Sequence, residues 1–490
     1  MKQTLDGNDI IRAMQERHKS ISSKQGLDPR EAQAFENDLR SLLDDNPDHP
    51  VFAFQLGTYY MQIERTGEAI ALIKMAMQNG AMGSAPLLNM AAAYKSSHHD
   101  DQAEKCYKDA LEEARKEGDT DAMAHSYHGL ASLYVNRGTP DVCIMYAKKA
   151  LELNPTDRHA LWNKGLAHLE RGDWEEGFKL YHEAGFTSSE HKGSERKIKD
   201  YNGAPQWDGK PKPDGSKPLV VCYGEQGVGD EVMFASMLPD LFRDCDVILD
   251  VDKRLENLMR DSFPEAKGVY TTSSISDFPF WAKDYPIDAM VPMGSLGYWY
   301  RKTSKDFPKV PFFKANEAKR EAWRERLKDF KGLKVGICYY GGLKKTRQDK
   351  RSIAPPRLEN ILKIEGIDWF SLQYHQWSAD VAAKYGAEFG VPIHHWGDAI
   401  DDWDEMAAFI SELDLVITIN SSLHHLCGAL GVKQWCLTPK YCAWRYGVSG
   451  PSPWYDNCEL FRQKKDDDWE TVLRNVATEL RALTAKEVAA

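Results

Sequence analysis

A period of 34 residues runs through the first third of this 490-residue chain. Four segments align on a small residue that is followed three positions later by Tyr or His, with further small residues 12 and 19 positions on. The aligned small residues are Gly57, Ala91, Ala131 and Gly165, at spacings of 34, 40 and 34. The six additional residues fall in the charged segment 112–120, which predicts a longer helix there. Small residues at fixed offsets let two helices cross closely, so the pattern predicts a stack of helix pairs.

This spacing resembles the tetratricopeptide repeat, which implies an α-solenoid with a concave surface for a partner. A generic helical solenoid is the alternative interpretation. We predict N-terminal helices and a half-repeat in 1–48, with Phe35, Leu39 and Leu42 on its apolar face, and the solenoid in 49–186. The candidate groove residues are Tyr59, Asn89, Tyr127, His128, Asn136 and Lys164.

The pattern changes after a linker at 187–217 that is rich in Gly, Pro, Ser and Lys. Short apolar strands then alternate with amphipathic helices, which is typical of parallel sheets in α/β domains. The predicted strands cover 219–224, 247–251, 334–340, 369–373, 414–420 and 434–439. We expect two Rossmann-like domains, 218–330 and 331–490, with ligands bound beyond the carboxyl ends of the strands.

Composition excludes several classes of function. The net charge of −11 argues against a nucleic-acid partner held by bulk electrostatics. The chain has no run of 18 apolar residues, so no membrane span is predicted. The first residues lack the apolar core of a secretory signal. The nine cysteines include no CxxC motif, so we expect reduced thiols and a cytoplasmic protein.

The loop 224–231, GEQGVGDE, follows the first predicted strand. Gly227 and Gly229 would let the backbone approach a ligand closely. The spacing is GxxGxG, whereas a dinucleotide-binding loop has GxGxxG, so an NAD-type oxidoreductase is disfavoured. Asp230 could act as a general base on an acceptor hydroxyl or could cap the following helix.

A basic loop follows the strand 334–340. Eight basic residues and one acidic residue lie within 331–357, in a chain that is acidic overall. Such a loop suits a diphosphate, although basic runs also form ordinary solvated faces. The donor-binding candidates here are Tyr339, Gly341, Lys344, Lys345, Arg347 and Arg351, with Gln373 at the end of the next strand.

A third loop begins at Asn420, where Ser421 and Ser422 precede a helix of small residues and can bind an anion at its start. His425 is predicted either to face the ligand or to pack in a hydrogen-bonded position. Adjacent histidines on a helix diverge by about 100°, so His424 and His425 do not predict a metal site. The Asp-Val-Asp segment 250–252 is interpreted as a strand end, and no metal site is predicted.

Together, these loops resemble a glycosyltransferase of GT-B type linked to tetratricopeptide repeats, similar to the ADP-heptose/heptosyltransferase superfamily (family 9-like). Further motifs that carry the resemblance are GDWEEG at 172–177, WDG at 207–209, RSI at 351–353, SLQ at 371–373, DLVI at 414–417, WR at 444–445, SPWY at 452–455 and LFRQ at 460–463.

The resemblance implies an inverting, metal-independent transferase without a cofactor, with Asp230 as base and the C-terminal domain binding a nucleotide-sugar. It also implies that the loops at 344–351 and 420–425 hold donor phosphate and sugar. Asn420 replaces the family's Asp, which leaves the sugar open, and a non-catalytic scaffold is the alternative function. The acceptor is expected to be a protein or a glycan held in the solenoid groove. The nucleobase of the donor, the identity of the acceptor and the oligomeric state stay open.

Overall fold

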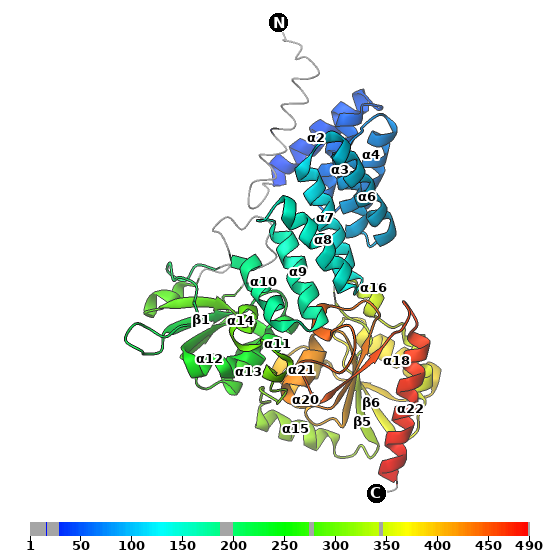
Figure 1. Ribbon diagram of the computed structural model, residues 1–490. Coiled ribbons are helices and arrows are strands. Elements are labelled where there is room, and N and C mark those ends of the chain that lie inside the picture. The colour runs from blue at the N-terminus through cyan, green and yellow to red at the C-terminus, as the bar shows by residue number, and fades with distance from the viewer. Residues whose placement is uncertain (1–15, 17–28, 187–198, 274–278, 343–345, 489–490) are drawn as a thin grey trace. The chain divides into compact units, whose positions relative to one another are not determined.

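The computed structural model describes residues 16, 29–186, 199–273, 279–342 and 346–488 (Figure 1). Internal contacts divide the chain into two units. The first comprises Met1–Val135 with Asp141–Asn163, and the second comprises Asn136–Pro140 with Lys164–Ala490. The predicted fold class is confirmed, because helical repeats are followed by parallel-sheet α/β domains.

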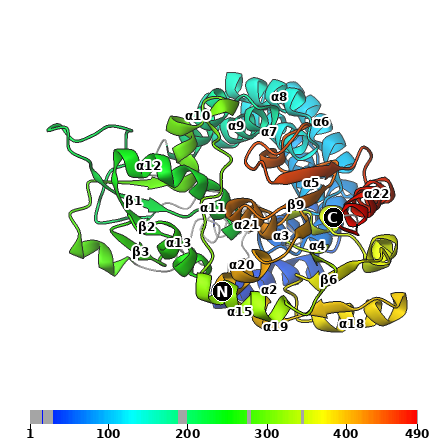
Figure 2. The same cartoon turned by 90° about the horizontal axis from the view of Figure 1, so that it is seen from below.

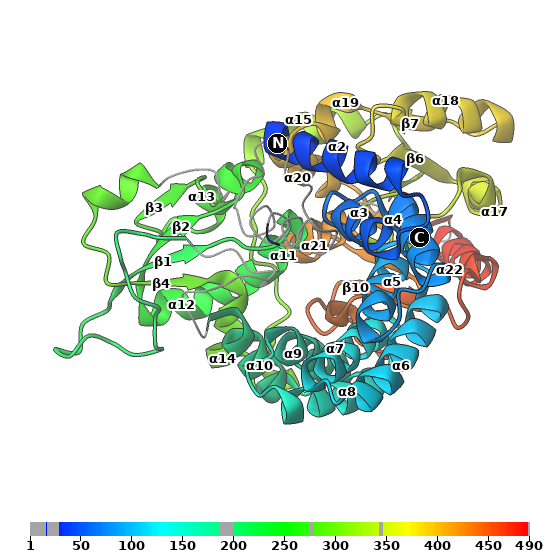
Figure 3. The same cartoon turned by 90° about the horizontal axis from the view of Figure 1, so that it is seen from above.

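The first unit is built of antiparallel helix pairs stacked in chain order (Figure 3). Its helices are α2 (Pro29–Asp45), α3 (Pro50–Gln62), α4 (Thr66–Gln78), α5 (Ser84–Ser96), α6 (Asp100–Glu117), α7 (Thr120–Asn136) and α8 (Pro140–Leu153). The predicted close crossing is visible at Gly57, where an added Cβ would lie only 2.8 Å from Ile73 of the paired helix. The additional residues lengthen two consecutive helices: α6 has 18 residues and α7 has 17, against 13 in each of α3, α4 and α5. The cap of α6 is Gly118, in the left-handed conformation (φ 69°).

The half-repeat α2 packs on the first full pair through Phe35 and Leu39, as its apolar face predicts. Tyr59 belongs to the same cluster: its ring lies 5.2 Å from that of Phe35, and its hydroxyl donates to the carbonyl oxygen of Ala32. The prediction that Tyr59 lines a partner groove is therefore wrong, since its side chain is used in the core.

The second unit contains α9 (Arg158–Arg171) from Lys164 onward and α10 (Trp174–Phe186). By sequence, these two helices form the fourth repeat pair, and the predicted solenoid ended at 186. By its contacts, α10 instead packs within the α/β unit, against α14 (Gly297–Tyr300) and the turn Met293–Leu296. The ring of Phe178 occupies the space that a Cβ at Gly297 would need, which explains the glycine there.

The N-terminal α/β domain has a four-stranded parallel sheet of order β3-β2-β1-β4. Its strands are β1 (Leu219–Tyr223), β2 (Asp246–Asp250), β3 (Gly268–Tyr270) and β4 (Ala289–Pro292), and the remaining helices of this domain are α11 (Val228–Phe234), α12 (Leu238–Asp244) and α13 (Glu256–Ser262). Asp250, at the end of β2, is fully buried and accepts hydrogen bonds from Tyr201 and Thr272. Its carboxylate supports the fold of this strand end, as the sequence interpretation held.

The C-terminal α/β domain has a six-stranded parallel sheet of order β10-β9-β8-β5-β6-β7. Its strands are β5 (Leu333–Ile337), β6 (Ile367–Ser371), β7 (Ile393–His395), β8 (Leu415–Ile419), β9 (Gln434–Thr438) and β10 (Cys458–Arg462). Its helices are α15 (Glu317–Leu327), α16 (Gln348–Arg351), α17 (Glu359–Leu362), α18 (Ser378–Phe389), α19 (Gly397–Ile400), α20 (Trp403–Ile410), α21 (Ser422–Leu430) and α22 (Trp469–Val488). The chain runs outward from β5 in one direction and from β8 in the other. The loops that follow these two strands therefore emerge side by side, where ligands bind in such sheets.

In the described part of the chain, no helix is long and apolar enough to cross a membrane.

Candidate functional site

Helices α11 and α21 bring the two α/β domains together (Figure 2). A Cβ added at Gly229 would lie 3.1 Å from the Cα of Ser422 and 3.4 Å from Cδ2 of His425. Only a glycine permits this approach without displacing a neighbour. The glycine loop of one sheet and the serine loop of the other, which are almost 200 residues apart, thus meet at a single place.

Asp230 and Arg445 form an ion pair at this meeting point. The carboxylate belongs to α11, and the guanidinium belongs to the turn Trp444–Tyr446 between β9 and β10. Their side chains are only 17% and 18% exposed, so solvent screens the pair weakly. The alternative that Asp230 caps α11 is wrong, because the cap position is Gly227 and the carboxylate points to Arg445.

Arg351 is the second guanidinium of the site. Its Nη1 donates to the carbonyl oxygen of Asn420 at 3.1 Å, and its Nη2 donates to Thr346. The side chain fills the space beside Gly342, which has a left-handed φ of 86°. Burial lowers the pKa of Arg351, and the charge of Arg445 lowers it further. Two cations therefore influence each other across this site.

Both guanidiniums have unused hydrogen-bonding capacity. The Nε–H groups of Arg351 and Arg445 are buried and have no hydrogen-bond partner among the described residues. A buried N–H group without a partner is costly, and on a cation it attracts an anion. The only carboxylate paired with either arginine in that part of the chain is Asp230. The arrangement is therefore suited to a further anion with several oxygen atoms.

The third loop supplies backbone N–H groups to the same region. Ser421 is the N-cap of α21 and Ser422 begins the helix. Asn420 is buried; its carbonyl oxygen accepts from Arg351, and its side chain accepts from Sγ of Cys436 at 3.3 Å. The first turn of a helix of this length presents free N–H groups to an anion.

Of the two alternatives predicted for His425, facing the ligand or packing in a hydrogen-bonded position, the structure has the packed one. Its Nδ1 hydrogen-bonds the hydroxyl of Tyr455 at 3.1 Å, and burial, together with the nearby charges of His424 and Arg445, holds its pKa well below the usual value. His424 instead bonds Gln434 at 2.9 Å. The two histidines thus point to different partners, as their helical spacing requires.

Tyr339 and Gln373, which were predicted to bind the donor, are both buried. The ring of Tyr339 is buried in the core of the C-terminal domain, because the alternation of β5 continues into this residue. Gln373 is fully buried and clamps the loop after β5: it accepts from the backbone N–H groups of Tyr339 and Tyr340 and donates to the carbonyl oxygen of Tyr340. Both residues shape the loop from beneath.

The remaining candidates of the basic loop are distributed around it. Lys344 and Lys345 lie outside the described residues. Arg347 precedes α16 with a left-handed φ of 57°. Gly341 lies between two loops, since a Cβ there would be 3.4 Å from the hydroxyl of Tyr374 and 3.9 Å from Cβ of Ser421.

An aromatic shelf follows β6, and the sequence interpretation missed it. We define the shelf as Tyr374, His375 and Trp377. Tyr374 is 50% and Trp377 is 37% exposed, and the ring of His375 stacks on both at centroid distances of 4.5 and 4.8 Å. The Tyr374 hydroxyl accepts a hydrogen bond from the N–H of Gly342 at 3.1 Å. The shelf therefore adjoins the loop that carries Gly341.

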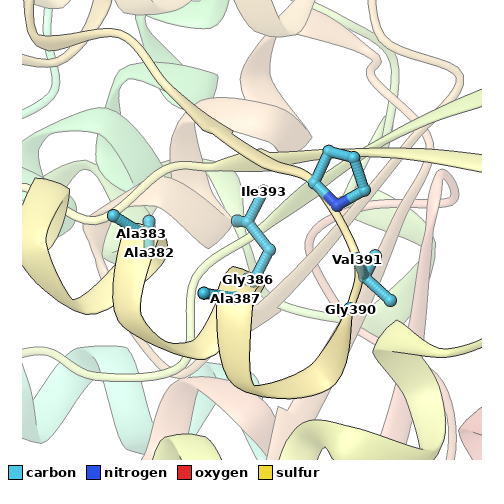
Figure 4. A pocket seen from close by; sticks show the side chains of 8 residues that line it. Ala382, Ala383, Gly386, Ala387, Gly390, Val391 and Ile393 are labelled. Atoms are coloured by element: carbon cyan, nitrogen blue, oxygen red, sulfur yellow. The ribbon is translucent and has the colours of Figure 1, made fainter.

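A separate depression of about 380 Å³ lies beside α18 (Figure 4). Its lining residues are Ala382, Ala383, Gly386, Ala387, Gly390, Val391, Pro392 and Ile393. None of these side chains is titratable or nucleophilic. The depression also lies at the amino end of β7, whereas the loops described above lie at carboxyl ends. Its lining therefore provides no group that could catalyse a reaction.

Comparison with known proteins identifies one repeat of the first unit. Residues 124–157, which cover most of α7 and all of α8, match the family model of the tetratricopeptide repeat. The chain contains a tetratricopeptide repeat. Over 497 aligned residues it is 26% identical to Protein FlbA of Caulobacter vibrioides, covering 90% of this chain and 80% of that protein.

Similar solved structures exist for each part of the chain. A glycosyl transferase family 9 structure from Veillonella parvula is 11% identical with a TM-score of 0.40, covering 55% of this chain and 97% of that one. The E. coli ADP-heptose LPS heptosyltransferase II is 14% identical with a TM-score of 0.39, covering 55% and 99%. The tetratricopeptide part is similar to MamA, at 20% identity and a TM-score of 0.29, covering 37% and 93%. The fold assignment itself rests on the strand order and connections given above.

Proposed function

We propose that this protein is a glycosyltransferase that moves a sugar from a nucleotide-sugar donor to a hydroxyl acceptor. One observation carries the proposal: the carboxylate of Asp230 is paired with Arg445, the charge of Arg445 acts on Arg351, and the buried Nε–H groups of both arginines have no partner among the described residues. This combination supports Asp230 as a base beside a site for an anion, where the two parallel-sheet domains meet. Sugar transfer from a diphosphate needs both.

The proposed chemistry follows from the charges. Asp230 takes the proton of the acceptor hydroxyl while the oxygen of that hydroxyl bonds to the anomeric carbon, and the bond from that carbon to the diphosphate oxygen breaks. Because the acceptor attacks on the face opposite the leaving diphosphate, the configuration is inverted. Arg351, Arg445 and the first N–H groups of α21 stabilise the departing diphosphate, each contributing about 3–4 kcal/mol when properly placed. The guanidiniums supply the positive charge that a metal ion provides elsewhere, so the proposed transfer is metal-independent.

The aromatic shelf supports a nucleotide as the leaving group. Exposed aromatic faces stack on nucleobases, and each such contact contributes roughly 1–3 kcal/mol. A Cβ at Gly341 would lie near both the hydroxyl of Tyr374 and Cβ of Ser421. A nucleoside diphosphate could thus extend from the shelf, across the glycine backbone, to the anion site.

The acceptor is proposed to be a protein or a glycan recruited by the tetratricopeptide repeats, whose general role is to bind partners. Each of the nine cysteines, all within the described ranges, is a free thiol. Free thiols fit a reducing compartment, and we propose the cytoplasm.

A second candidate is a scaffold that binds a nucleotide-sugar without turnover. The specific observation in its favour is Asn420, which has no charge and whose side-chain oxygen is already bonded to Cys436. In that function the repeats would present a partner, and the α/β domains would report nucleotide-sugar levels.

The test is a panel of nucleotide-sugars, with thermal stabilisation and release of nucleoside diphosphate as the two measurements. We expect one donor to stabilise the protein and to be slowly hydrolysed. Arg351→Ala and Arg445→Ala should weaken its binding more than tenfold. The control Arg326→Ala removes a cation that is 40% exposed and paired with Asp398, and should bind the donor normally.

The outcomes separate the candidates. Stabilisation without hydrolysis, and without transfer when cell extracts supply acceptors, favours the scaffold. Unchanged binding in both arginine variants would remove the anion site from the proposal. Stabilisation by NAD alone would overturn both functions.

A further inference from the structure

Helix α10, the last helix of the repeat region by sequence, reaches the loop that carries Asp230. Tyr181 on this helix is fully buried, and its hydroxyl accepts a hydrogen bond from Nε2 of Gln226 at 2.5 Å and donates to Oε1 of Glu225 at 3.2 Å. The same Glu225 oxygen accepts from the N–H of Gly294 at 3.0 Å. A single tyrosine hydroxyl therefore contacts two consecutive side chains of the glycine loop.

This loop needs support from outside itself. Gln226 has a left-handed φ of 65°, which is unfavourable for a residue with a Cβ. Glu225 is only 1% exposed, and a buried carboxylate must find hydrogen-bond donors. Hydrogen-bond partners for these two side chains come from α10, through Tyr181, and from the turn at Gly294.

Helix α10 also contacts the element that carries Arg445. The ring of Trp444 lies 6.2 Å from that of Phe178 and 6.4 Å from that of Tyr181. Tyr181 in turn lies 6.1 Å from Phe234 at the end of α11. One helix thus packs beside both members of the Asp230–Arg445 pair, although they belong to different α/β domains.

We infer that Tyr181 is a positioning residue for the proposed transfer: its hydroxyl fixes the loop 224–227, so that α11 starts where Asp230 reaches Arg445. The helix that ends the repeat region by sequence then belongs to the proposed reaction site. The inference rests on the proposed function to the extent that Asp230 is the base.

The decisive variant is Tyr181→Phe, which keeps the ring packing and removes only the hydroxyl. Tyr60→Phe is the matched control, because Tyr60 is also a buried repeat tyrosine whose hydroxyl donates to a glutamate, Glu36. Gln226→Gly is the second variant: it removes the other half of the hydrogen bond and also relieves the unfavourable φ, so it is expected to fold.

The full-length proteins are compared by hydrogen exchange, by nucleoside diphosphate binding and by hydrolysis of the nucleotide-sugar that stabilises the wild type. We expect Tyr181→Phe to raise amide exchange at residues 229–231 and to lower kcat about tenfold. Diphosphate affinity and binding stoichiometry should stay at wild-type values, which shows that the fraction of folded protein is unchanged. The double variant with Gln226→Gly should be no slower than Tyr181→Phe alone, since the hydrogen bond that Gln226→Gly removes is already absent in Tyr181→Phe.

Wild-type exchange at 229–231 together with wild-type kcat in Tyr181→Phe would overturn the inference while leaving the proposed function intact. Additive losses in the double variant would also overturn it, because Gln226 would then act on the loop independently of the Tyr181 hydroxyl. If exchange rises as expected but the wild type hydrolyses no donor, Tyr181 still positions the loop and the proposed reaction fails instead.

Discussion

The carboxylate of Asp230 is ion-paired with the guanidinium of Arg445, and the two residues belong to different α/β domains. The proposed base is therefore held by a cation from the domain that is proposed to bind the donor. A diphosphate entering the site would compete with Asp230 for the same guanidinium. Donor binding would thus release the base at the moment when it is needed.

The first prediction concerns Asp230→Asn. Turnover should fall by roughly 10²–10⁴, the usual contribution of a general base. Nucleoside diphosphate affinity, measured by calorimetry, should be equal to or tighter than that of the wild type, because the competing carboxylate is gone. Asp398→Asn, on the surface, is the control. Full turnover in Asp230→Asn would eliminate this residue as the base, and weaker diphosphate binding would contradict the competition.

The second prediction uses two glycines of one loop. Gly229→Val should lower the melting temperature and abolish diphosphate binding, because even a Cβ at this position lies 3.1 Å from Ser422 of the other domain. Gly227→Ala should be nearly neutral, since φ there is −114° and the nearest atom to its Cβ, Oδ2 of Asp230, is 3.6 Å away. Equal effects in thermal denaturation and binding would contradict the close crossing of α11 and α21.

The third prediction concerns the aromatic shelf. Tyr374→Ala and Trp377→Ala should each weaken nucleoside diphosphate binding about tenfold, as expected for one lost stacking contact. Pyrophosphate, which has no base, should bind both variants as it binds the wild type. Phe280→Ala removes an aromatic ring that is 71% exposed elsewhere and is the control. Parallel losses for both ligands would show that the shelf acts on the phosphate site instead.

Local features of the fold could be predicted from the sequence, whereas the pairing of distant side chains could not. The repeat at Gly57 and the strand before Asn420 are encoded within a few residues, by small-residue spacing and by continuous apolar runs. Arg445 meets Asp230 across 215 positions, and nothing near either residue indicates the other. Tyr339 was misassigned because proximity to a strand end does not say which face of the sheet a side chain occupies.

Glu170, on α9, is a buried acid that the proposed reaction does not use. It is 2% exposed, and its Oε2 has no hydrogen-bond partner among the described residues. Burial raises the pKa of Glu170 from its ordinary value near 4.5 to about 8. The folded protein therefore keeps a proton that the unfolded chain gives up in the range between these values. Stability from this group is fully present below about pH 4.5 and is lost as the pH rises toward 8.

The last prediction follows from this loss of stability as the pH rises. Glu170→Gln cannot ionise, so it should raise the free energy of unfolding at pH 8 by on the order of 3 kcal/mol and change it little near pH 4.5. Melting temperatures of variant and wild type across this range measure the difference. Glu321→Gln, whose side chain is 68% exposed, should show no such trend. A gain for Glu170→Gln that is the same at both ends of the range would mean that the carboxyl is not a buried, protonated acid, since a pure packing effect does not depend on pH.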